Sequence, residues 1–341
     1  MTATARAVSQ EQPFQRLSAL VAKDMEAVNT VIATRMASDN APRIPEVTRH
    51  LVEAGGKRLR PILTIAAALL CDYTGQDHVK LAATVEFIHT ATLLHDDVVD
   101  ESGQRRGRPT ANLLWDNKSS VLVGDYLFAR SFQLMVECGS LRVLDILANA
   151  SAVIAEGEVL QLSTGGSLAV EEATYLRMIH GKTAALFAAA TEVGGVIAKA
   201  PEDRIQALRA YGRDLGMAFQ IVDDVLDYGG TAARLGKNVG DDFREGKMTL
   251  PVLIAVADAK LAGDAETLAF WTRCIETPAK QREGDLEDAL RRLSQGGALD
   301  RATMRARDYV STARSSLDGF APSPLRDALS DVAEFVVSRL S

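Results

Sequence analysis

Apolar side chains recur at intervals of three and four residues along most of the chain. Leu141, Leu144 and Leu147 are one example. These intervals match the α-helical period, whereas convincing runs of alternating apolar and polar residues are few. Three segments are apolar on most faces, which is typical of helices buried inside a bundle: 61–70, 79–94 and 183–198. The pattern predicts an all-α protein with buried central helices.

The domain organisation follows from length and composition. The chain has 341 residues, and no linker rich in Pro, Gly or Ser divides it. We therefore expect one large helical domain at residues 13–341, preceded by a flexible N-terminal tail at residues 1–12. Abundant Ala and Leu with only ten prolines agree with a helical fold.

Charge and cysteine usage exclude several classes of protein. The net charge of −7 and the lack of a long basic run argue against a nucleic-acid-binding surface. No stretch reaches the roughly 18 uninterrupted apolar residues of a bilayer-spanning helix, and the N-terminus lacks the apolar core of a secretory signal. We therefore expect a cytoplasmic protein. Cys71, Cys138 and Cys274 lack the spacing of zinc or redox sites and are expected to be buried reduced thiols.

The same five-residue acidic pattern occurs twice, each time at the end of a long apolar helical run. The two clusters are Asp96-Asp97-Val98-Val99-Asp100 and Asp223-Asp224-Val225-Leu226-Asp227. In an α-helix, the first and last carboxylates of such a cluster lie one turn apart on the same face and can point at one ion. Mg²⁺ is commonly held by one or two protein carboxylates together with substrate phosphate oxygens. Two facing clusters therefore predict a divalent-cation site that holds a diphosphate.

Basic residues follow each acidic cluster in a segment punctuated by glycine. Arg105 and Arg106 follow the first cluster, and Lys237 and Lys247 follow the second. Glycine and proline end the helix in such segments, so these cations are expected on loops beside the carboxylates. Arginine offers paired N–H donors that suit phosphate oxygens.

Six motifs occur in an order that resembles the trans-isoprenyl diphosphate synthases, or polyprenyl synthetases. They are Gly55-Gly56-Lys57-Arg58-Leu59-Arg60-Pro61, Phe87-Ile88-His89, the first acidic cluster with Arg105-Arg106-Gly107, Gly181-Lys182-Thr183, Phe219-Gln220-Ile221-Val222, and the second acidic cluster. The resemblance covers nearly all of residues 51–251 and is strongest to the long-chain octaprenyl and decaprenyl diphosphate synthases of ubiquinone biosynthesis. It implies an isoprenoid-synthase-type helical bundle around a central cavity. The chain from Ala259 onward carries no such motif and is expected to supply packing helices.

The resemblance implies a Mg²⁺-dependent prenyltransferase. It would condense isopentenyl diphosphate head to tail onto an allylic diphosphate, with farnesyl or geranyl diphosphate as primer. The implied product is decaprenyl or octaprenyl diphosphate for the ubiquinone side chain, and decaprenyl is favoured on similarity alone. The family further implies three Mg²⁺ ions per site with substrate bound, Mn²⁺ as an alternative metal, and a homodimer.

The resemblance also assigns roles to individual residues. The implied metal ligands are Asp96, Asp100 and Asp223, with Asp97, Asp224 and Asp227 as further ligands or neighbours of ligands. These six aspartates and Lys182 form the implied catalytic set. The allylic diphosphate would be bound by Arg105, Lys182, Thr183, Gln220, Lys237 and Lys247. Isopentenyl diphosphate would be bound by Lys57, Arg60, His89 and Arg106.

Product length is implied by the residues about one turn before the first aspartate. In the family these residues form the floor beneath the growing tail, and aromatic side chains there stop elongation early. Here they are Ala91 and Thr92, and no Phe or Tyr lies between Ile88 and Asp96. The resemblance therefore implies an open floor and a long product in an apolar tunnel.

Other interpretations remain open for single features. One acidic cluster alone could be a solvated surface, Arg105 and Arg106 alone are most often solvated loop charges, and His89 alone is more often a satisfied core histidine than a ligand. Ala91 and Thr92 could be ordinary helix packing. The functional interpretation therefore depends on the ordered set of motifs rather than on any one residue.

Rival functions make different demands on the sequence. A shorter-chain synthase, a terpene cyclase and a non-catalytic subunit of a heteromeric prenyl synthase share the predicted fold. A cyclase usually has a second metal motif of the Asn/Ser/Glu type, and a non-catalytic subunit has degraded motifs, whereas both clusters are intact here. A calcium-binding loop would need acidic residues at alternate positions around a central Gly. The segment 181–183 lacks the upstream glycines of a nucleotide phosphate loop, and the further ligands of a phosphohydrolase that begins with His95-Asp96 cannot be placed.

Overall fold

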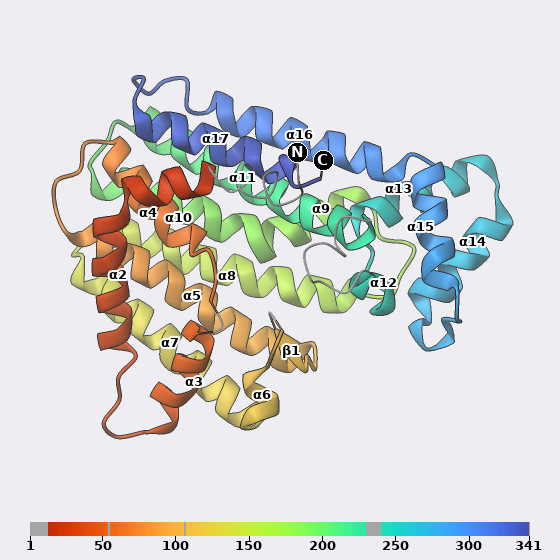
Figure 1. The fold of residues 1–341 in the computed structure, drawn as a ribbon, viewed down its shortest axis with the longest axis horizontal. Helices are drawn as coiled ribbons and strands as arrows, with labels where there is room; N and C mark the ends of the chain where they lie inside the picture. The colour runs from red at the N-terminus through yellow and green to blue at the C-terminus, as the bar shows by residue number, and fades with distance from the viewer. Residues whose placement is uncertain (1–12, 54, 106, 230–239, 341) are drawn as a thin grey trace, which may run out of the picture.

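The computed structural model describes residues 13–53, 55–105, 107–229 and 240–340, and most of these residues are helical (Figure 1). After a helical segment at residues 13–20, the longer helices are α2 (Ala22–Arg35), α3 (Arg43–Glu53), α4 (Leu59–Leu70), α5 (Asp77–Val99), α7 (Asn117–Glu137), α8 (Leu141–Thr164), α9 (Glu172–Ile179), α10 (Ala185–Ile197), α11 (Glu202–Tyr228), α13 (Leu250–Ala262), α15 (Asp285–Gln295), α16 (Ala298–Ser315) and α17 (Pro324–Ser338). The shorter elements are β1 (Gln104–Arg105), β2 (Arg108–Pro109), α6 (Ala111–Leu114), η1 (His180–Ala184), α12 (Asp241–Arg244), α14 (Ala265–Trp271), η3 (Thr272–Glu276) and η4 (Pro278–Lys280). The predicted all-α fold is confirmed. The predicted tail at residues 1–12 lies outside the described residues.

Four helices, α4, α5, α10 and α11, form the centre of the bundle. In α10 every residue from 185 to 195 is buried, and α4 is buried from Pro61 to Ala68. Helix α10 packs against α4, α5, α8 and α11, so it has a neighbour on each side. This arrangement confirms that the three segments apolar on most faces are central helices.

Both acidic clusters lie in the last turn of a long helix. Helix α5 ends at Val99 and α11 ends at Tyr228, so each cluster extends to the carboxyl end of its helix. The carboxyl end of a helix carries partial negative charge, which makes a concentration of carboxylates there unfavourable unless cations are close by. The fold therefore places the acidic residues where the demand for a cation is greatest.

A π-helical turn carries Lys182 and Thr183. This turn, η1, is pressed between α8 and α11 by close backbone contacts. A Cβ atom added at Gly181 would lie 2.9 Å from the Cα of Gly157 on α8, and one added at Gly216 would lie 2.6 Å from the Cα of Ala184. Only glycine permits such approaches, so these positions fix the turn against both helices. Such π-helical turns are frequent at functional sites.

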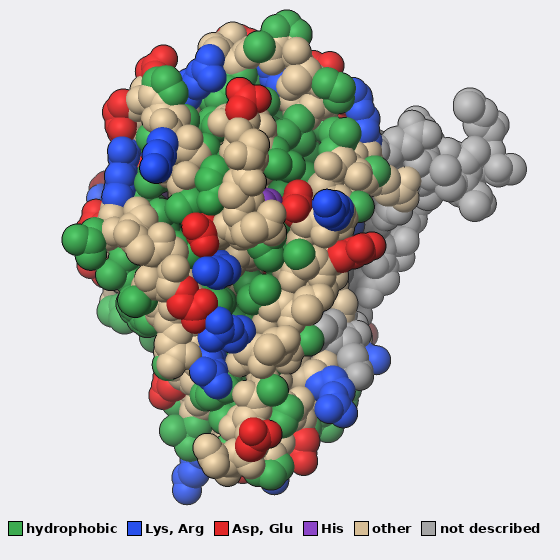
Figure 2. Space-filling model, turned by 90° about the vertical axis from the view of Figure 1, so that its left-hand side faces the viewer, with side chains coloured by type: hydrophobic (Ala, Val, Ile, Leu, Met, Phe, Trp, Pro, Cys, Tyr) green, Lys and Arg blue, Asp and Glu red, His purple; other side chains and the backbone are tan. Residues whose placement is uncertain are grey.

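Figures 1 and 2 show the two ends of the bundle. Figure 1 shows α14 and α15 in a separate corner at the right-hand end, while α16 and α17 run along the top. Figure 2 views the opposite end, where acidic, basic and apolar side chains are interspersed.

Among the described residues no helix combines the length and apolar character needed to cross a membrane. The three cysteines are free, but only Cys274 is buried; the prediction of buried thiols is wrong for the half-buried Cys71 and Cys138.

Candidate functional site

Asp96 lies in the last turn of α5, and Asp100 directly follows the last helical residue, at the helix end that the sequence predicts. Burial raises the pKa of Asp96 to about 7, and the negative charges of Glu158 and Asp100 act in the same direction, against the cations Lys182 and Arg105. Within the described residues the Asp96 carboxylate accepts no hydrogen bond and forms no ion pair. This carboxylate is therefore poorly compensated, which is a property of sites that bind a cation.

Asp97, unlike Asp96, is paired with a cation of the protein. Its side chain is 1% exposed and accepts a hydrogen bond of 2.8 Å from Arg105 Nε. Its backbone oxygen accepts from the Asn112 amide at 3.2 Å and from the Ser102 N–H at 2.9 Å. Asp97 and Arg105 thus hold the segment after α5 to the end of the helix.

Asp224 is the buried centre of a hydrogen-bonded chain. The Tyr175 hydroxyl donates to its Oδ2 at 2.7 Å, and Gln220 Nε2 donates to its Oδ1 at 2.9 Å. Thr183 in turn donates its hydroxyl to Gln220 Oε1 at 2.8 Å. Burial raises the pKa of Asp224 to about 7, and the nearby charge of Asp242 adds to the effect. The chain fixes Thr183 and Gln220, two residues predicted to contact the allylic diphosphate.

The other two aspartates of the second cluster have different partners. Asp227 accepts backbone N–H groups of Asp241 at 3.2 Å and Asp242 at 3.0 Å, which attaches α12 to the end of α11. Burial and the Asp242 charge nevertheless raise the pKa of Asp227 to about 6. Asp223 instead pairs with Arg339 at 3.0 Å. The second cluster is thus only partly compensated by protein cations.

One cavity of about 530 Å³ joins the two clusters. The predicted site residues that line it are Asp100, Lys182, Gln220, Asp224 and Lys247. Because Asp100 comes from α5 and Asp224 from α11, the cavity lies between the carboxyl ends of the two helices. The structure therefore brings the two predicted clusters to one site.

Two lysines in this cavity are held by carboxylates. Lys182 Nζ lies 3.0 Å from Glu158 Oε1 and 3.4 Å from Gln161 Oε1. Lys247 Nζ lies 2.5 Å from Glu245 and 3.5 Å from Asp242. Burial alone would lower the pKa of Lys247, but these two carboxylates raise it above its ordinary value, so the lysine stays charged. Both cations are thus positioned to be shared with an anionic ligand.

Of the predicted isopentenyl diphosphate residues, Arg60 lies on α4, His89 lies on α5, and Lys57 lies in the segment just before α4. Arg60 Nη1 is 3.1 Å from His89 Nε2, and the Arg60 guanidinium is 4.4 Å from the ring centre of Phe187. Lys57 Nζ lies between the rings of Phe14 and Phe335, at 5.8 and 5.3 Å from their centres. These cation–π contacts hold both cations in place beside aromatic rings.

A second, much smaller cavity adjoins these residues. It measures about 40 Å³ and is lined by Gly55, Gly56, Arg58, His89 and Arg105 among others. Arg105 therefore connects the end of α5 with the predicted isopentenyl diphosphate site. The predicted ligands Arg106 and Lys237 lie outside the described residues.

The predicted floor residues lie on the buried part of α5. Ala91 is fully buried, and Thr92 is half-buried with its hydroxyl donating to the backbone oxygen of His89 at 2.8 Å. A second apolar cluster lies further back along α5, where Leu81, Val85 and Ile88 pack against side chains of α7, α8 and α10. The side chains that precede the first aspartate cluster on α5 thus pack in an apolar environment, which a hydrocarbon tail requires.

Several residues of this site were not predicted from the sequence. They are Glu158, Gln161, Tyr175, Asp242 and Arg339. Glu158 and Gln161 are one turn apart on the same helical face, and Asp242 lies in the segment already marked by its lysines, so these carried a weak signal. Arg339 carried none, because the C-terminal part was expected to supply only packing helices.

The donor set fits a divalent cation only with help from a ligand. Among the described residues no three His, Cys, Asp or Glu side chains converge closely enough to hold a metal by themselves. The poorly compensated Asp96 and the raised pKa values of Asp224 and Asp227 nevertheless indicate excess negative charge between the two helix ends. Hard carboxylate oxygens suit Mg²⁺, which takes part of its ligand shell from water and substrate phosphates.

Comparison with known families identifies the class of protein. A family model described as Polyprenyl synthetase matches residues 41–293. The chain belongs to the polyprenyl synthetase family, as the six motifs indicated.

Individual relatives narrow this class. The octaprenyl diphosphate synthase of Escherichia coli (strain K12) is 43% identical over 328 residues, covering 96% of this chain and 99% of the relative. The crystal structure of a decaprenyl diphosphate synthase from Rhodobacter capsulatus has 63% identity and a TM-score of 0.92, covering 96% of this chain and 99% of that one. A polyprenyl synthase from Caulobacter crescentus CB15, complexed with calcium and isoprenyl diphosphate, has 51% identity and a TM-score of 0.89, covering 96% and 98%.

Proposed function

We propose that the protein is a long-chain trans-polyprenyl diphosphate synthase. It condenses isopentenyl diphosphate onto a farnesyl or geranyl primer and makes decaprenyl or octaprenyl diphosphate, the precursor of a ubiquinone side chain. The observation that carries the proposal is the single cavity that joins Asp100 of the first cluster with Asp224 of the second and with Lys182 and Lys247. The names of the relatives support a long product.

The reaction requires departure of diphosphate from the allylic substrate. Asp96, Asp100, Asp223 and Asp227 would hold Mg²⁺, and the bound ion would neutralise charge on the leaving diphosphate. Lys182 and Lys247 add positive charge to the lining of the same cavity, and Thr183 and Gln220 offer hydrogen bonds from positions fixed through Asp224. Asp97 contributes indirectly by holding Arg105.

The second substrate keeps its diphosphate and therefore needs a site without metal activation. Lys57, Arg60 and His89 supply contacts of this kind, joined by Arg105 at the boundary of the two sites. The double bond of isopentenyl diphosphate forms the new C–C bond as the allylic C–O bond breaks, and the released diphosphate takes up the proton that leaves. No protein nucleophile is required.

The direct test is to identify the product. Purified protein would be incubated with farnesyl diphosphate, isopentenyl diphosphate and Mg²⁺, and the dephosphorylated lipid would be analysed by mass spectrometry. A polyprenol of eight to ten isoprene units is expected from the names of the relatives. A cyclic hydrocarbon would instead indicate a terpene cyclase, and no metal-dependent product would indicate a non-catalytic subunit.

Product length should depend on Ala91. Because Ala91 is fully buried next to the site, Ala91→Phe places an aromatic ring below the first cluster and should shift the product to shorter polyprenols. The shift is measured by mass spectrometry of the dephosphorylated products, with Ala91→Ser as a control that adds no ring. An unchanged product distribution would remove Ala91 from the tunnel floor.

We also propose a homodimer that forms through α6 to α8. Large exposed apolar side chains concentrate on these helices: Leu113, Leu114, Val121, Leu122, Phe132, Val136, Leu141, Val159 and Leu162. A concentration of this kind on one region marks a protein interface, and the implied partner is a second copy of the chain. Leu122→Glu with Val136→Glu should give monomers in sedimentation equilibrium, whereas Leu261→Glu on α13, also highly exposed, should not. Wild-type protein that sediments as a monomer would refute this part.

A further inference from the structure

The C-terminal turn after α17 contacts the candidate site. Arg339 Nη2 lies 3.0 Å from Asp223 Oδ1, and its guanidinium carbon lies 5.5 Å from the ring centre of Phe219, one turn earlier on α11. One turn before Arg339, Phe335 lies 5.3 Å from Lys57 Nζ. The end of α17 thus contacts both a predicted metal ligand and a predicted isopentenyl diphosphate ligand.

The Arg339–Asp223 pair differs from the Arg105–Asp97 pair of the first cluster. Asp97 is 1% exposed and bound to Arg105, eight residues away on the adjoining loop. The side chains of Arg339 and Asp223 remain 23% and 27% exposed, and the two residues are 116 positions apart in the chain. A partly exposed pair of this kind is weak, because water competes for both partners. The buried Asp97–Arg105 pair is suited to stabilise the local structure, whereas the partly exposed Asp223–Arg339 pair is suited to dissociate.

We propose that Arg339 occupies the place of a divalent cation at Asp223 in the substrate-free enzyme and is displaced when metal and diphosphate bind. The guanidinium and the metal would compete for the same carboxylate, so Arg339 raises the metal concentration at which the site fills. This inference deepens the proposed function, since it depends on Asp223 being a metal ligand.

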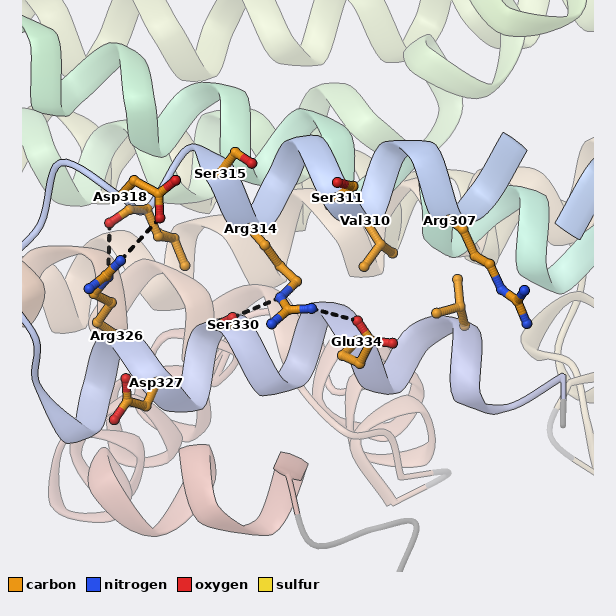
Figure 3. A pocket seen from close by; sticks show the side chains of 12 residues that line it. Arg307, Val310, Ser311, Arg314, Ser315, Asp318, Arg326, Asp327, Ser330 and Glu334 are labelled. Carbon is orange, nitrogen blue, oxygen red and sulfur yellow. Dashed lines mark hydrogen bonds and ion pairs between the residues drawn. The ribbon is translucent and has the colours of Figure 1, made fainter. Parts of the chain in front are cut away.

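The fold allows this exchange without moving α17. Leu329, Val332 and Val336 of α17 are buried in the main core. The helix is also tied to α16, where Arg314 donates to Ser330 at 3.0 Å and to Glu334 at 2.9 Å (Figure 3). Arg339 lies just beyond the last helical residue, Ser338. Only one long side chain therefore has to leave Asp223.

The test measures metal binding directly. Mn²⁺ would be titrated into the protein in the presence of inorganic diphosphate, and free Mn²⁺ would be followed by electron paramagnetic resonance. Arg339→Gln should tighten Mn²⁺ binding by about two- to fivefold, the range expected for loss of a weak competing ion pair. Arg339→Lys keeps the positive charge and should stay close to wild type.

Two further variants make the result specific. Arg314→Gln removes an arginine that ties α16 to α17 outside the site, so it should leave Mn²⁺ binding unchanged and controls for loosening of α17. Asp223→Asn should weaken Mn²⁺ binding. If it does not, Asp223 is not a metal ligand and that part of the proposed function fails together with this inference.

The remaining outcomes concern Arg339 alone. If Asp223→Asn weakens binding while Arg339→Gln leaves it unchanged, the pair has no role in metal entry and the inference is overturned. If Arg339→Gln weakens binding, the arginine helps to hold the diphosphate rather than competing with the metal, which also overturns it. Thermal unfolding of each variant verifies that the protein is folded.

Discussion

The environments of two acidic regions of the molecule shift carboxyl pKa values in opposite directions. At the corner between η3 and α15, Asp285 accepts from both terminal nitrogens of Arg273, one at 2.9 Å, and from the Arg282 backbone N–H at 2.6 Å. The Arg273 hydrogen bonds lower the pKa of Asp285 to about 2. At the candidate site, burial and neighbouring acids raise the pKa of Asp96 to about 7.

The difference separates charges that stabilise the fold from charges reserved for a ligand. Asp285 contributes to stability in its ionised form, because its partners favour the carboxylate. Ionised Asp96 instead opposes folding, since burial and like charges favour its protonated form. A carboxylate that is costly to the empty protein and gains a partner only on binding is typical of a functional site.

The largest effect should come from removing a carboxylate at the site. Asp96→Ala or Asp223→Ala should lower turnover about a thousandfold, since charge on the leaving diphosphate is no longer balanced. Turnover is measured by incorporation of labelled isopentenyl diphosphate, and circular dichroism should report an intact fold. Asp125→Ala on α7, an exposed acid outside the cavity, is the matched control. Near-normal rates in either site variant would remove that residue from the metal site.

A smaller effect, on stability rather than activity, should come from replacing Asp285 at the corner between η3 and α15. Asp285→Asn should lower the free energy of unfolding by about 2–4 kcal/mol, because it leaves Arg273 without its buried counter-ion. Turnover per folded molecule should change less than about twofold. The contribution of Asp285 is fully present above its ordinary pKa of 3.8 and is lost as the pH falls through about 2. Urea unfolding should therefore give a difference from wild type that is large at pH 7 and shrinks below pH 4; a variant as stable as wild type at pH 7 would contradict this.

The sequence specified the position of the candidate site far better than the ion pairs of either region. Periodicity predicted α5 and α11, and the two acidic clusters predicted a site at their ends, because these signals are local in the chain. Ion pairs that join distant segments, such as Arg339 with Asp223 over 116 positions, depend on tertiary packing and left no pattern to find. The sequence also did not show which aspartates of a cluster pair with a protein cation. Nothing local distinguished Asp96, which has no partner among the described residues, from Asp97, which is bound to Arg105.

The smallest predicted effect is a change in the free energy of unfolding on replacing Asp96. It is the sharpest test of the contrast between Asp96 and Asp285, because the same substitution should remove activity and stabilise the protein. In metal-free buffer with a chelator at pH 8, Asp96→Asn should raise the free energy of unfolding by about 1–2 kcal/mol, a value reduced for the partial exposure of Asp96. The sign follows from a folded pKa of about 7 against an ordinary value of 3.8: the cost of ionised Asp96 grows as the pH rises from about 4 to about 7 and is constant above that. The gain measured by urea unfolding should therefore nearly vanish at pH 4. Adding Mg²⁺ with inorganic diphosphate should reverse the order at pH 8, since ligand binding stabilises the wild type more than the variant. A variant less stable than wild type at pH 8 without metal would mean that Asp96 is compensated in the empty protein, and the contrast with Asp285 would not hold.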